Sequence, residues 1–403
     1  MGRRMVIPLP TVIVRGNGAR FVEERGSLNV YRKWVEILSR KHLRDGRLVA
    51  VEDEEGNLLG CGFYDGVGPV ALRIIEIGKC SYSSEEEAIT ALIERAYNAR
   101  KRSKLVYEGS GYRLVNSDGD WLPGIIIDVY DDVAVIQSSS IVWDKNLEKI
   151  LYALREITEV KHVYEKSTQR TRRDIGLEPR ERLLLGTKTR TVIQEEDIQF
   201  IVDIRKGQKT GFFLDQRSNR IEFGKLAYGE VLDLFAYTGG FGLHALLRGD
   251  VKRVVFVEED KNAVELLKEN LELNKIGRDA EIVVDNVWNF LKKRNIEKKF
   301  DSIAVDPPAF IQEPSNKDRG RKAYETLYAL SLKAATQGSL VFLSSCSSHL
   351  TPTEFEEIIS NAILQLKREA IILGGLRKLP SDHTVRPLTP YLDYLKAFFM
   401  YVM

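Results

Sequence analysis

Residues 231–258 read VLDLFAYTGGFGLHALLRGDVKRVVFVE, and this stretch decides the fold. Its first apolar run, Val231–Phe235, predicts a buried strand, and a glycine-rich turn then leads into a helical segment. A second apolar run predicts another buried strand, which ends on the carboxylate of Glu258. The pattern is typical of a βαβ unit whose first turn brings a ligand close to backbone N–H groups. Glycine suits such a turn because it leaves room for the ligand and adopts positive φ.

This unit predicts a site for a cofactor that contains adenosine, because an acid such as Glu258 can accept both hydroxyls of a ribose. The spacing of Gly239, Gly240 and Gly242 differs from Gly-x-Gly-x-x-Gly, which disfavours a dinucleotide. A purely structural alternative is open as well. In that case the glycines would serve close packing of helix on strand, and Glu258 would be a solvated acid.

Strands and helices alternate from about residue 197 to the end, which predicts a doubly wound α/β domain. We expect its strands at Val231–Phe235, Val254–Glu258, Ile282–Asp285, Ser302–Asp306, Ser339–Leu343, near Ile371, and at Ala397–Val402. A small β-rich domain is expected over residues 1–79, a central α/β domain over 80–196, and the doubly wound domain over 197–403.

The composition is that of a globular protein. Of the 403 residues 43% are hydrophobic and 29% charged, and the formal net charge is only +2. A nucleic-acid surface must therefore come from local clusters of charge. The cysteines Cys61, Cys80 and Cys346 form neither a disulfide framework nor a metal-ligand pattern, which favours a reducing cytoplasm. We find no apolar run long enough for a membrane span and no signal-peptide core, and we expect a cytoplasmic protein without metal.

The segment 166–190 is the strongest local cluster of positive charge. It carries eight Lys or Arg residues against three acids, with Thr and Gln between them. We expect a loop that contacts the phosphates of a nucleic acid, the alternative being a merely solvated loop. Upstream of it, Ser84 and Glu87 predict a capping box at the start of a helix.

Four of the expected strand ends carry polar or reactive groups. They are the turn after Asp233, Glu258, the pair Asp285-Asn286, and Asp306-Pro307-Pro308. Ligands gather beyond the carboxyl ends of the strands in an open α/β sheet. Asp285 could accept from an adenine amine. The first proline holds Asp306 in an extended conformation, which suits an acid placed against a planar base.

Cys346 follows the next strand, in Ser344-Ser345-Cys346-Ser347, shortly before a helix capped by Thr351-Pro-Thr-Glu354. A thiol near a helix N-terminus can have a lowered pKa and act as a nucleophile. Its place opposite the Asp-Pro-Pro loop favours that role over a buried, inert thiol. His349 is a weaker candidate for a base or a phosphate contact, and Asp382-His383 is weaker still.

Together these motifs resemble the large-subunit rRNA cytosine carbon-5 methyltransferases. The resemblance rests on Gly207-Gln-Lys-Thr-Gly-Phe-Phe-Leu-Asp-Gln-Arg217, the 233–242 loop, Asp306-Pro-Pro-Ala-Phe310 and Ser345-Cys346-Ser347. Ser117-Asp-Gly-Asp-Trp-Leu-Pro-Gly124 also matches the family, and residues 51–62 resemble a PUA module. The resemblance covers essentially the whole chain. It implies a PUA domain, a central domain of the EEHEE type, and a Rossmann-like domain that uses S-adenosylmethionine.

The resemblance also assigns roles to residues at matching positions. Cys346 would be the nucleophile and Asp306 would face the target base. The cofactor would be bound by Asp233, Phe235, Tyr237, Gly239, Gly240, Glu258, Asp285, Asn286 and Asp306. Large-subunit rRNA is the implied partner, and a homodimer is compatible with the sequence. Pro308 and Ala309 stand where many RNA cytosine methyltransferases carry a second cysteine, so product release would not use a second thiol.

The implied mechanism begins with addition of the Cys346 thiolate to carbon 6 of cytosine, which makes carbon 5 nucleophilic. The target base must lie outside a stack, so we expect single-stranded or flipped RNA. Three alternatives stay open at this point: methylation of guanine N7, methylation of uridine carbon 5, and a non-catalytic protein that binds RNA.

Overall fold

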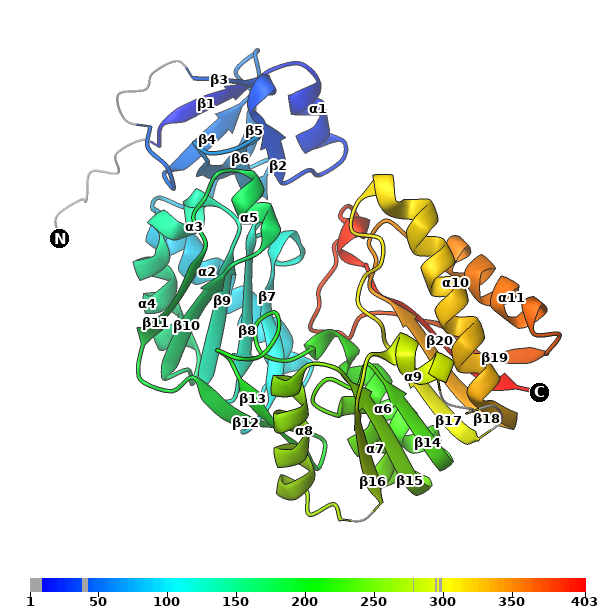
Figure 1. Cartoon of the computed structure of the whole chain (residues 1–403). Helices are drawn as coiled ribbons and strands as arrows, with labels where there is room; N and C mark the ends of the chain where they lie inside the picture. The colour runs from blue at the N-terminus through cyan, green and yellow to red at the C-terminus, as the bar shows by residue number, and fades with distance from the viewer. Residues whose placement is uncertain (1–8, 38–42, 278, 294–295, 297–298) are drawn as a thin grey trace. The chain divides into compact units, whose positions relative to one another are not determined.

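The computed structural model describes residues 9–37, 43–277, 279–293, 296 and 299–403 (Figure 1). The chain divides into two compact units. Unit 1 contains Met1–Thr191, Val202–Phe212 and Ser381–Pro390, and unit 2 contains Val192–Ile201, Phe213–Pro380 and Tyr391–Met403.

Unit 1 begins with a sheet whose order, over the described residues, is β2-β6-β5-β4-β1-β3. The strand β4 pairs antiparallel with β5, and Asp53 closes their turn by accepting from the backbone N–H groups of Glu55 and Asn57. The elements are β1 (Thr11–Val14), α1 (Asn17–Glu23), β2 (Asn29–Tyr31), η1 (Arg32–Trp34), β3 (Val35–Glu36), β4 (Leu48–Glu52), β5 (Leu58–Tyr64) and β6 (Val70–Ile77).

A second sheet of unit 1 has the order β11-β10-β9-β8-β7. The helices α2 and α4 contribute Leu92 and Leu154 to its core. The elements are α2 (Glu85–Arg102), β7 (Gly111–Asn116), η2 (Ser117–Asp120), β8 (Ile125–Tyr130), β9 (Val133–Ser138), α3 (Ile141–Lys145), α4 (Leu147–Ile157), β10 (His162–Ser167), α5 (Arg170–Asp174) and β11 (Arg180–Leu185). A two-stranded sheet of β12 (Arg190–Glu195) and β13 (Ile198–Asp203) follows, and its residues 192–201 belong to unit 2.

Unit 2 is built on a sheet of order β16-β15-β14-β17-β18-β20-β19 in its described part. The first five of these strands run parallel, and β20 is antiparallel to both of its neighbours. The elements are η3 (Leu214–Gln216), α6 (Arg217–Leu226), β14 (Tyr228–Leu234), α7 (Gly240–Arg248), β15 (Asp250–Glu258), α8 (Lys261–Leu273), β16 (Ala280–Val284), α9 (Val287–Lys293), β17 (Phe300–Val305), η4 (Pro314–Asn316), α10 (Lys317–Ala334), β18 (Ala335–Ser345), α11 (Pro352–Gln365), β19 (Ala370–Arg377), η5 (Pro390–Leu392) and β20 (Lys396–Val402).

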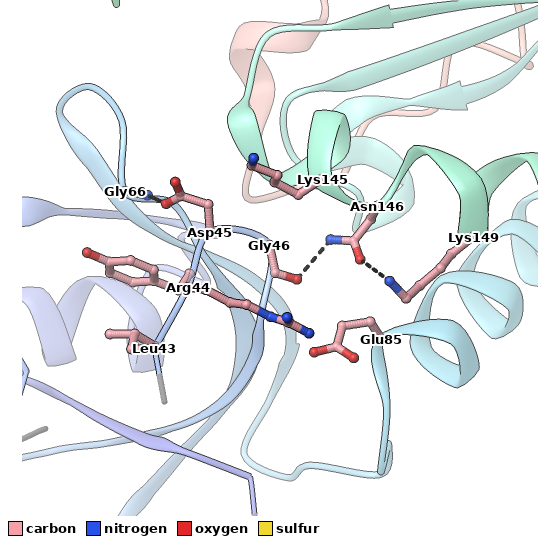
Figure 2. A pocket seen from close by; sticks show the side chains of 10 residues that line it. Leu43, Arg44, Asp45, Gly46, Gly66, Glu85, Lys145, Asn146 and Lys149 are labelled. Carbon is pink, nitrogen blue, oxygen red and sulfur yellow. Dashed lines mark hydrogen bonds between the residues drawn. The ribbon is translucent and has the colours of Figure 1, made fainter. Parts of the chain in front are cut away.

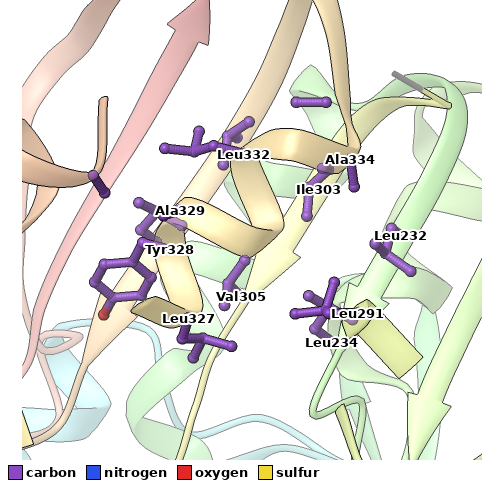
Figure 3. Packing of buried hydrophobic residues seen from close by; sticks show 14 of the residues in the cluster. Leu232, Leu234, Leu291, Ile303, Val305, Leu327, Tyr328, Ala329, Leu332 and Ala334 are labelled. Atoms are coloured by element: carbon purple, nitrogen blue, oxygen red, sulfur yellow. The ribbon is translucent and has the colours of Figure 1, made fainter. Parts of the chain in front are cut away.

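The central strands of unit 2 are apolar because they are covered on both faces. On one face, Leu232, Leu234, Ile303 and Val305 of the strands pack against Leu327 and its neighbours on α10 (Figure 3). On the other face, Phe342 of β18 contacts the rings of Phe223 on α6 and Phe241 on α7. This packing holds the carboxyl ends of β14, β17 and β18 in a fixed register.

The structure confirms the predicted fold class, and a strand lies at each of the seven places expected for the doubly wound sheet. The helix predicted after Ser84 is also present, but the capping box is not. The Ser84 side chain accepts from the Glu87 N–H, whereas the Glu87 carboxylate turns to the backbone and hydroxyl of Ser83.

The segment 166–190 differs from the expected loop. It contains the end of β10, the helix α5 and the strand β11. Several of its cations are paired inside the protein: Arg172 with Asp144, Arg182 with Glu165, and Lys188 with Asp132. These cations balance local acids, so the excess of charge read from the sequence overstates what is available to RNA.

Candidate functional site

The predicted site residues of unit 2 leave neighbouring strands at one edge of the sheet. Leu234 is paired with Val257 on one side and with Val305 on the other, and Val305 is paired with Leu343. The following residues therefore emerge side by side. Between β14 and β17 the chain order of the strands reverses, and ligands of open α/β sheets bind at such a switch point.

Asp233 lies at the centre of this edge and is only 1% exposed. Its Oδ2 accepts the N–H of Gly242 over 2.8 Å. Burial, with smaller contributions from the nearby acids Asp306 and Glu258, raises the pKa of Asp233 to about 7 against the opposing effect of the Gly242 N–H. This edge of the sheet is thus electronegative, which suits a ligand that carries positive charge.

The turn after β14 has a backbone that few residues adopt. Phe235, Tyr237 and Gly239 all have positive φ, at 61°, 49° and 88°. Positive φ is uncommon outside glycine, and two aromatic residues with positive φ only two positions apart indicate local strain, which is typical of functional turns. The ring of Tyr237 is steadied by an edge contact with Phe213, at 4.9 Å between centroids.

The glycines of this turn are required mainly by packing within the protein. A Cβ on Gly242 would lie 2.1 Å from the Phe256 ring, and one on Gly239 would lie 2.3 Å from Leu267. Helix α7 can therefore approach β15 closely because Gly242 lacks a side chain, while Gly239 leaves room for Leu267 of α8. Close packing of helix on strand accounts for them, as the structural alternative held, while the positive φ at Gly239 agrees with the turn geometry we expected.

Glu258 ends β15 and is held by three backbone N–H groups. Tyr237 donates to its Oε2 over 2.8 Å, while Glu259 and Asp260 donate to its Oε1. A carboxylate oxygen has two lone pairs. The half-buried Glu258 is therefore fixed in orientation and still has acceptor capacity on Oε2.

Asp285 and Asn286 follow β16, next to Glu258 in the register of the sheet. The Asp285 carboxylate accepts from the Asn286 N–H, and the side-chain Oδ1 of Asn286 accepts from the N–H of Trp288. The Asn286 amide also donates to Glu259. Asn286 thus starts helix α9, a structural task that the sequence did not reveal.

Asp306 follows β17 and is oriented by two neighbours. Its Oδ1 accepts from Nε2 of Gln216 over 2.7 Å and from the hydroxyl of Ser344 on the adjacent strand β18. Gln216 is itself fixed by Asn219, which donates to Oε1 over 2.6 Å. The Asp-Pro-Pro acid therefore has a defined direction at the end of β17.

Cys346 lies one residue beyond β18, with its Sγ 4.0 Å from the carbonyl oxygen of Pro307. The thiol is partly exposed. Next to it the Ser347 hydroxyl bonds to the hydroxyl of Tyr324 over 2.8 Å and accepts the N–H of Ile311. The structure thus brings Cys346 and the Asp306-Pro307 loop together, as their strand ends predicted.

Two other sequence candidates lie elsewhere. His349 is exposed in the turn before α11. Asp382 and His383 belong to unit 1 and are buried, where Asp382 accepts the N–H of Arg113 and contacts the His383 ring. The carbonyl of Asp382 also accepts from Arg100, whose guanidinium pairs with Asp120. This pair therefore ties the 381–390 segment into unit 1.

Sequence reasoning missed Gln216 and Ser344, which donate to Asp306, and Lys396, which donates to the carbonyl oxygen of Ser347 beside Cys346. Gln216 stood in the quoted 207–217 string, and Ser344 in the Ser-rich run before Cys346. Lys396 precedes the strand that we expected at Ala397, and it lies within β20 at 3% exposure. A lysine at the head of an otherwise apolar strand was the available signal.

A separate cavity of about 660 Å³ lies in unit 1 (Figure 2). The Asn146 amide donates to the Gly46 carbonyl and accepts from Lys149, and Asp45 accepts the N–H of Gly66. Glu85 accepts from Arg47 and from the N–H of Leu48. Many of its polar groups are used within unit 1, and no strand-end residue named above lines it.

The described residues contain no cluster of His, Cys, Asp or Glu that could hold a metal ion. Over the same part of the chain, no helix is both long and apolar enough to cross a bilayer.

Comparison with known proteins agrees with the two kinds of domain. Residues 12–76 match the family model of a PUA-like domain, and residues 218–319 match a family described as conserved hypothetical protein 95. A Streptococcus mutans protein described as a SAM-dependent methyltransferase has a similar structure, with a TM-score of 0.78 over 97% of this chain and 99% of that one. Their sequence identity is 24%, so this likeness shows the fold.

Two relatives are similar in sequence over nearly their whole length. A protein of Methanocaldococcus jannaschii described as a ribosomal RNA large subunit methyltransferase is 35% identical over 94% of this chain and 95% of its own. Ribosomal RNA large subunit methyltransferase I of Aeromonas hydrophila is 33% identical over 91% of this chain and 93% of its own. The chain therefore belongs to the family of the ribosomal RNA large subunit methyltransferases.

Proposed function

We propose that this protein transfers a methyl group from S-adenosylmethionine to carbon 5 of a cytosine in large-subunit rRNA, with Cys346 as the nucleophile. The observation that carries the proposal is the meeting of two strand ends. Asp306, oriented by Gln216 and Ser344, leaves β17, and Cys346 leaves the adjacent β18 with its sulfur 4.0 Å from the Pro307 carbonyl oxygen. A nucleophile and an acid at one edge of the sheet suit chemistry on a flat ring.

The residues at the switch point fit the cofactor. When bound, S-adenosylmethionine supplies a methyl group on a positively charged sulfur. The electronegative edge around Asp233 favours such a cation. Glu258 has acceptor capacity for a ribose hydroxyl, and Asp285, which follows the adjacent strand, would accept from the adenine amine. Phe235, Tyr237, Gly239, Gly240 and Asn286 would complete the binding site.

The chain's own groups would act in a simple sequence. The Cys346 thiolate adds to carbon 6 of the base, which forms an S–C6 bond and moves the ring's electrons toward carbon 5. Asp306 hydrogen-bonds the pyrimidine edge and stabilises the charge that develops there. After carbon 5 has taken the methyl group, its proton passes to water. The electrons of that C–H bond restore the C5–C6 double bond, and the S–C6 bond breaks to return the thiolate.

RNA would be held by unit 1. The PUA-like match at 12–76 supports this role, because PUA modules bind RNA, and salt should weaken binding steeply. We also propose a cytoplasmic location, which the sequence predicted. A homodimer is compatible with the sequence and is part of the same proposal.

The test is transfer of labelled methyl to rRNA by the wild type and by Cys346→Ala, followed by nucleoside analysis. We expect label in 5-methylcytidine and a loss of at least about 10³-fold in the variant, because the covalent step has no substitute. Cys61→Ala is the matched control, since Cys61 is fully buried in unit 1 and should leave transfer unchanged.

Other outcomes separate the rivals. Label in 7-methylguanosine that persists in Cys346→Ala would move the enzyme to the guanine class. Label in 5-methyluridine that is lost in Cys346→Ala would keep the covalent step and change the base. A wild type that binds RNA but fails to bind S-adenosylmethionine in calorimetry would favour the non-catalytic alternative.

A further inference from the structure

Lys396 is a buried lysine next to the proposed nucleophile. It begins β20, and its backbone is paired with Ser345 in the antiparallel register of β18 and β20. Its Nζ donates to the carbonyl oxygen of Ser347 over 2.8 Å, and the residue is 3% exposed. The ammonium group of Lys396 is thus bound to the residue that follows Cys346, and the backbone of Lys396 is paired with the residue that precedes Cys346.

The charge of Lys396 interacts with the Cys346 thiol and with two acids. Cys346, Asp393 and Glu354 are the groups that act on it electrostatically. Asp393 is already paired with Lys378 over 2.6 Å, and Glu354 with Lys317 over 2.6 Å and with Arg321. Both acids are therefore largely neutralised by other cations.

The phenols beside Cys346 stay neutral at physiological pH. Tyr324 and Tyr328 both lie within electrostatic range of the thiol, and burial raises the pKa of each. Asp306 also raises the pKa of Tyr328, and the same acid would oppose ionisation of a nearby thiol. A positive charge is consequently needed close to Cys346 if a thiolate is to form there at neutral pH.

A buried ammonium is unfavourable for folding, which argues that this one is kept for a purpose. Burial lowers the pKa of Lys396 to about 8, although Cys346, Asp393 and Glu354 act in the opposite direction. The amine is still mainly protonated at pH 7. Its charge is lost as the pH rises above 8.

We propose that Lys396 is a positioning residue whose ammonium group holds Cys346 as a thiolate ready to attack the base. The inference rests on the proposed function for its purpose but concerns the thiol alone. The pair would form a thiolate–ammonium couple before RNA binds. The proton released by the thiol goes to solvent.

The test measures alkylation of Cys346 by iodoacetamide as a function of pH in the full-length protein, without RNA or cofactor. Mass spectrometry of tryptic peptides follows each of the three cysteines separately. An unperturbed thiol has its midpoint near pH ~8.5. We expect a wild-type midpoint at least about one unit lower, and in Lys396→Met a midpoint at or above ~8.5 with a rate at pH 7 reduced about tenfold or more.

Two variants separate charge from packing. Lys396→Arg keeps the positive charge and should keep the low midpoint. Lys166→Met removes another buried lysine, whose Nζ donates to backbone carbonyls in unit 1, and should leave the Cys346 profile unchanged. The inference is overturned if the midpoint of Lys396→Met equals that of the wild type, or if the wild-type midpoint lies at ~8.5 or above.

A second measurement covers the case in which Lys396→Met does not fold. The pKa of Lys396 is followed by lysine-selective NMR in the wild type and in Cys346→Ala. Loss of a neighbouring thiolate should lower that pKa, and an unchanged pKa would overturn the inference. Failure of the proposed function would give a different result. Methyl transfer would then survive in Cys346→Ala, although the alkylation profile of the wild type would still show coupling between Cys346 and Lys396.

Discussion

Glu195 and Asp233 are two buried carboxyl groups of unit 2 with opposite surroundings. Glu195 receives two hydrogen bonds from the Arg220 guanidinium and one contact from the His244 ring. Although burial opposes ionisation, Arg220 and His244 lower the pKa of Glu195 to about 2. Asp233 instead meets a backbone N–H and further acids, and burial raises its pKa to about 7.

The difference separates a structural charge from a functional one. Arg220 neutralises the charge of Glu195 within the protein. It also donates to the Phe213 carbonyl oxygen and so fixes the 213–217 segment. The charge of Asp233 has no such cation among its principal interactions, apart from a minor effect of Arg220. The ionised carboxylate of Asp233 does not stabilise the fold by itself, whereas it would stabilise a bound cationic ligand.

The largest effect on stability is expected when the buried ion pair of Arg220 and Glu195 is broken. Arg220→Met should lower the free energy of unfolding by about 3–5 kcal/mol at pH 7, because it leaves Glu195 buried without its main partner. Urea denaturation measures the change. The loss should shrink as the pH falls toward 2, since Glu195 contributes its stability above about pH 4.5 and loses it as it is protonated. A change below about 1 kcal/mol at pH 7 would contradict the comparison.

Asp233→Asn should have the opposite sign. The folded pKa is raised, so Asp233 contributes stability that is fully present below its ordinary pKa of 3.8 and is lost as the pH rises through about 7. The variant should therefore be more stable than the wild type at pH 8, by on the order of 1–3 kcal/mol, with a smaller difference at pH 5. Binding of S-adenosylmethionine should weaken about tenfold or more. Thermal unfolding and calorimetry at both pH values test this, and equal destabilisation at pH 5 and 8 would refute it.

The charge of the ligand sharpens the comparison further. A cationic cofactor favours ionised Asp233, so affinity for S-adenosylmethionine should rise between pH 6 and pH 8, by up to about tenfold per unit below pH 7. S-adenosylhomocysteine has a neutral sulfur and should respond less. Titration calorimetry in buffers of different ionisation enthalpy would show proton release with the first ligand. Identical pH profiles for the two ligands would exclude the electrostatic role of Asp233.

The smallest effect is expected at the surface. Lys225 lies on α6 like Arg220, and it pairs with Glu196 at 3.2 Å with its side chain 55% exposed. Lys225→Met should change stability by no more than about 0.5 kcal/mol, and less in 1 M salt. It is the matched control for Arg220→Met in the same denaturation series. A larger effect here would mean that position on α6, rather than burial of charge, determines the loss.

The order of the elements in unit 2 could be predicted because each depends on local sequence. Apolar runs at Val231, Val254 and Ser302 predicted buried strands, and the structure has them. The acids at their ends also reach one edge, because parallel strands place their carboxyl ends together. The segment 166–190 shows the limit of this reasoning, since counts of charge do not reveal that Arg172 is buried against Asp144.

The sequence by itself determined the α/β fold class, the strand ends that carry Asp233, Glu258, Asp306 and Cys346, and the resemblance to a methyltransferase family. Only the tertiary structure decided which charged side chains are paired with an opposite charge within the protein. Lys396 and Ser347 are 49 residues apart and meet because β20 pairs with β18. Arg220 reaches Glu195 only when α6 packs beside β12. The physical reason is that pKa and reactivity depend on distances and burial, which long-range packing sets.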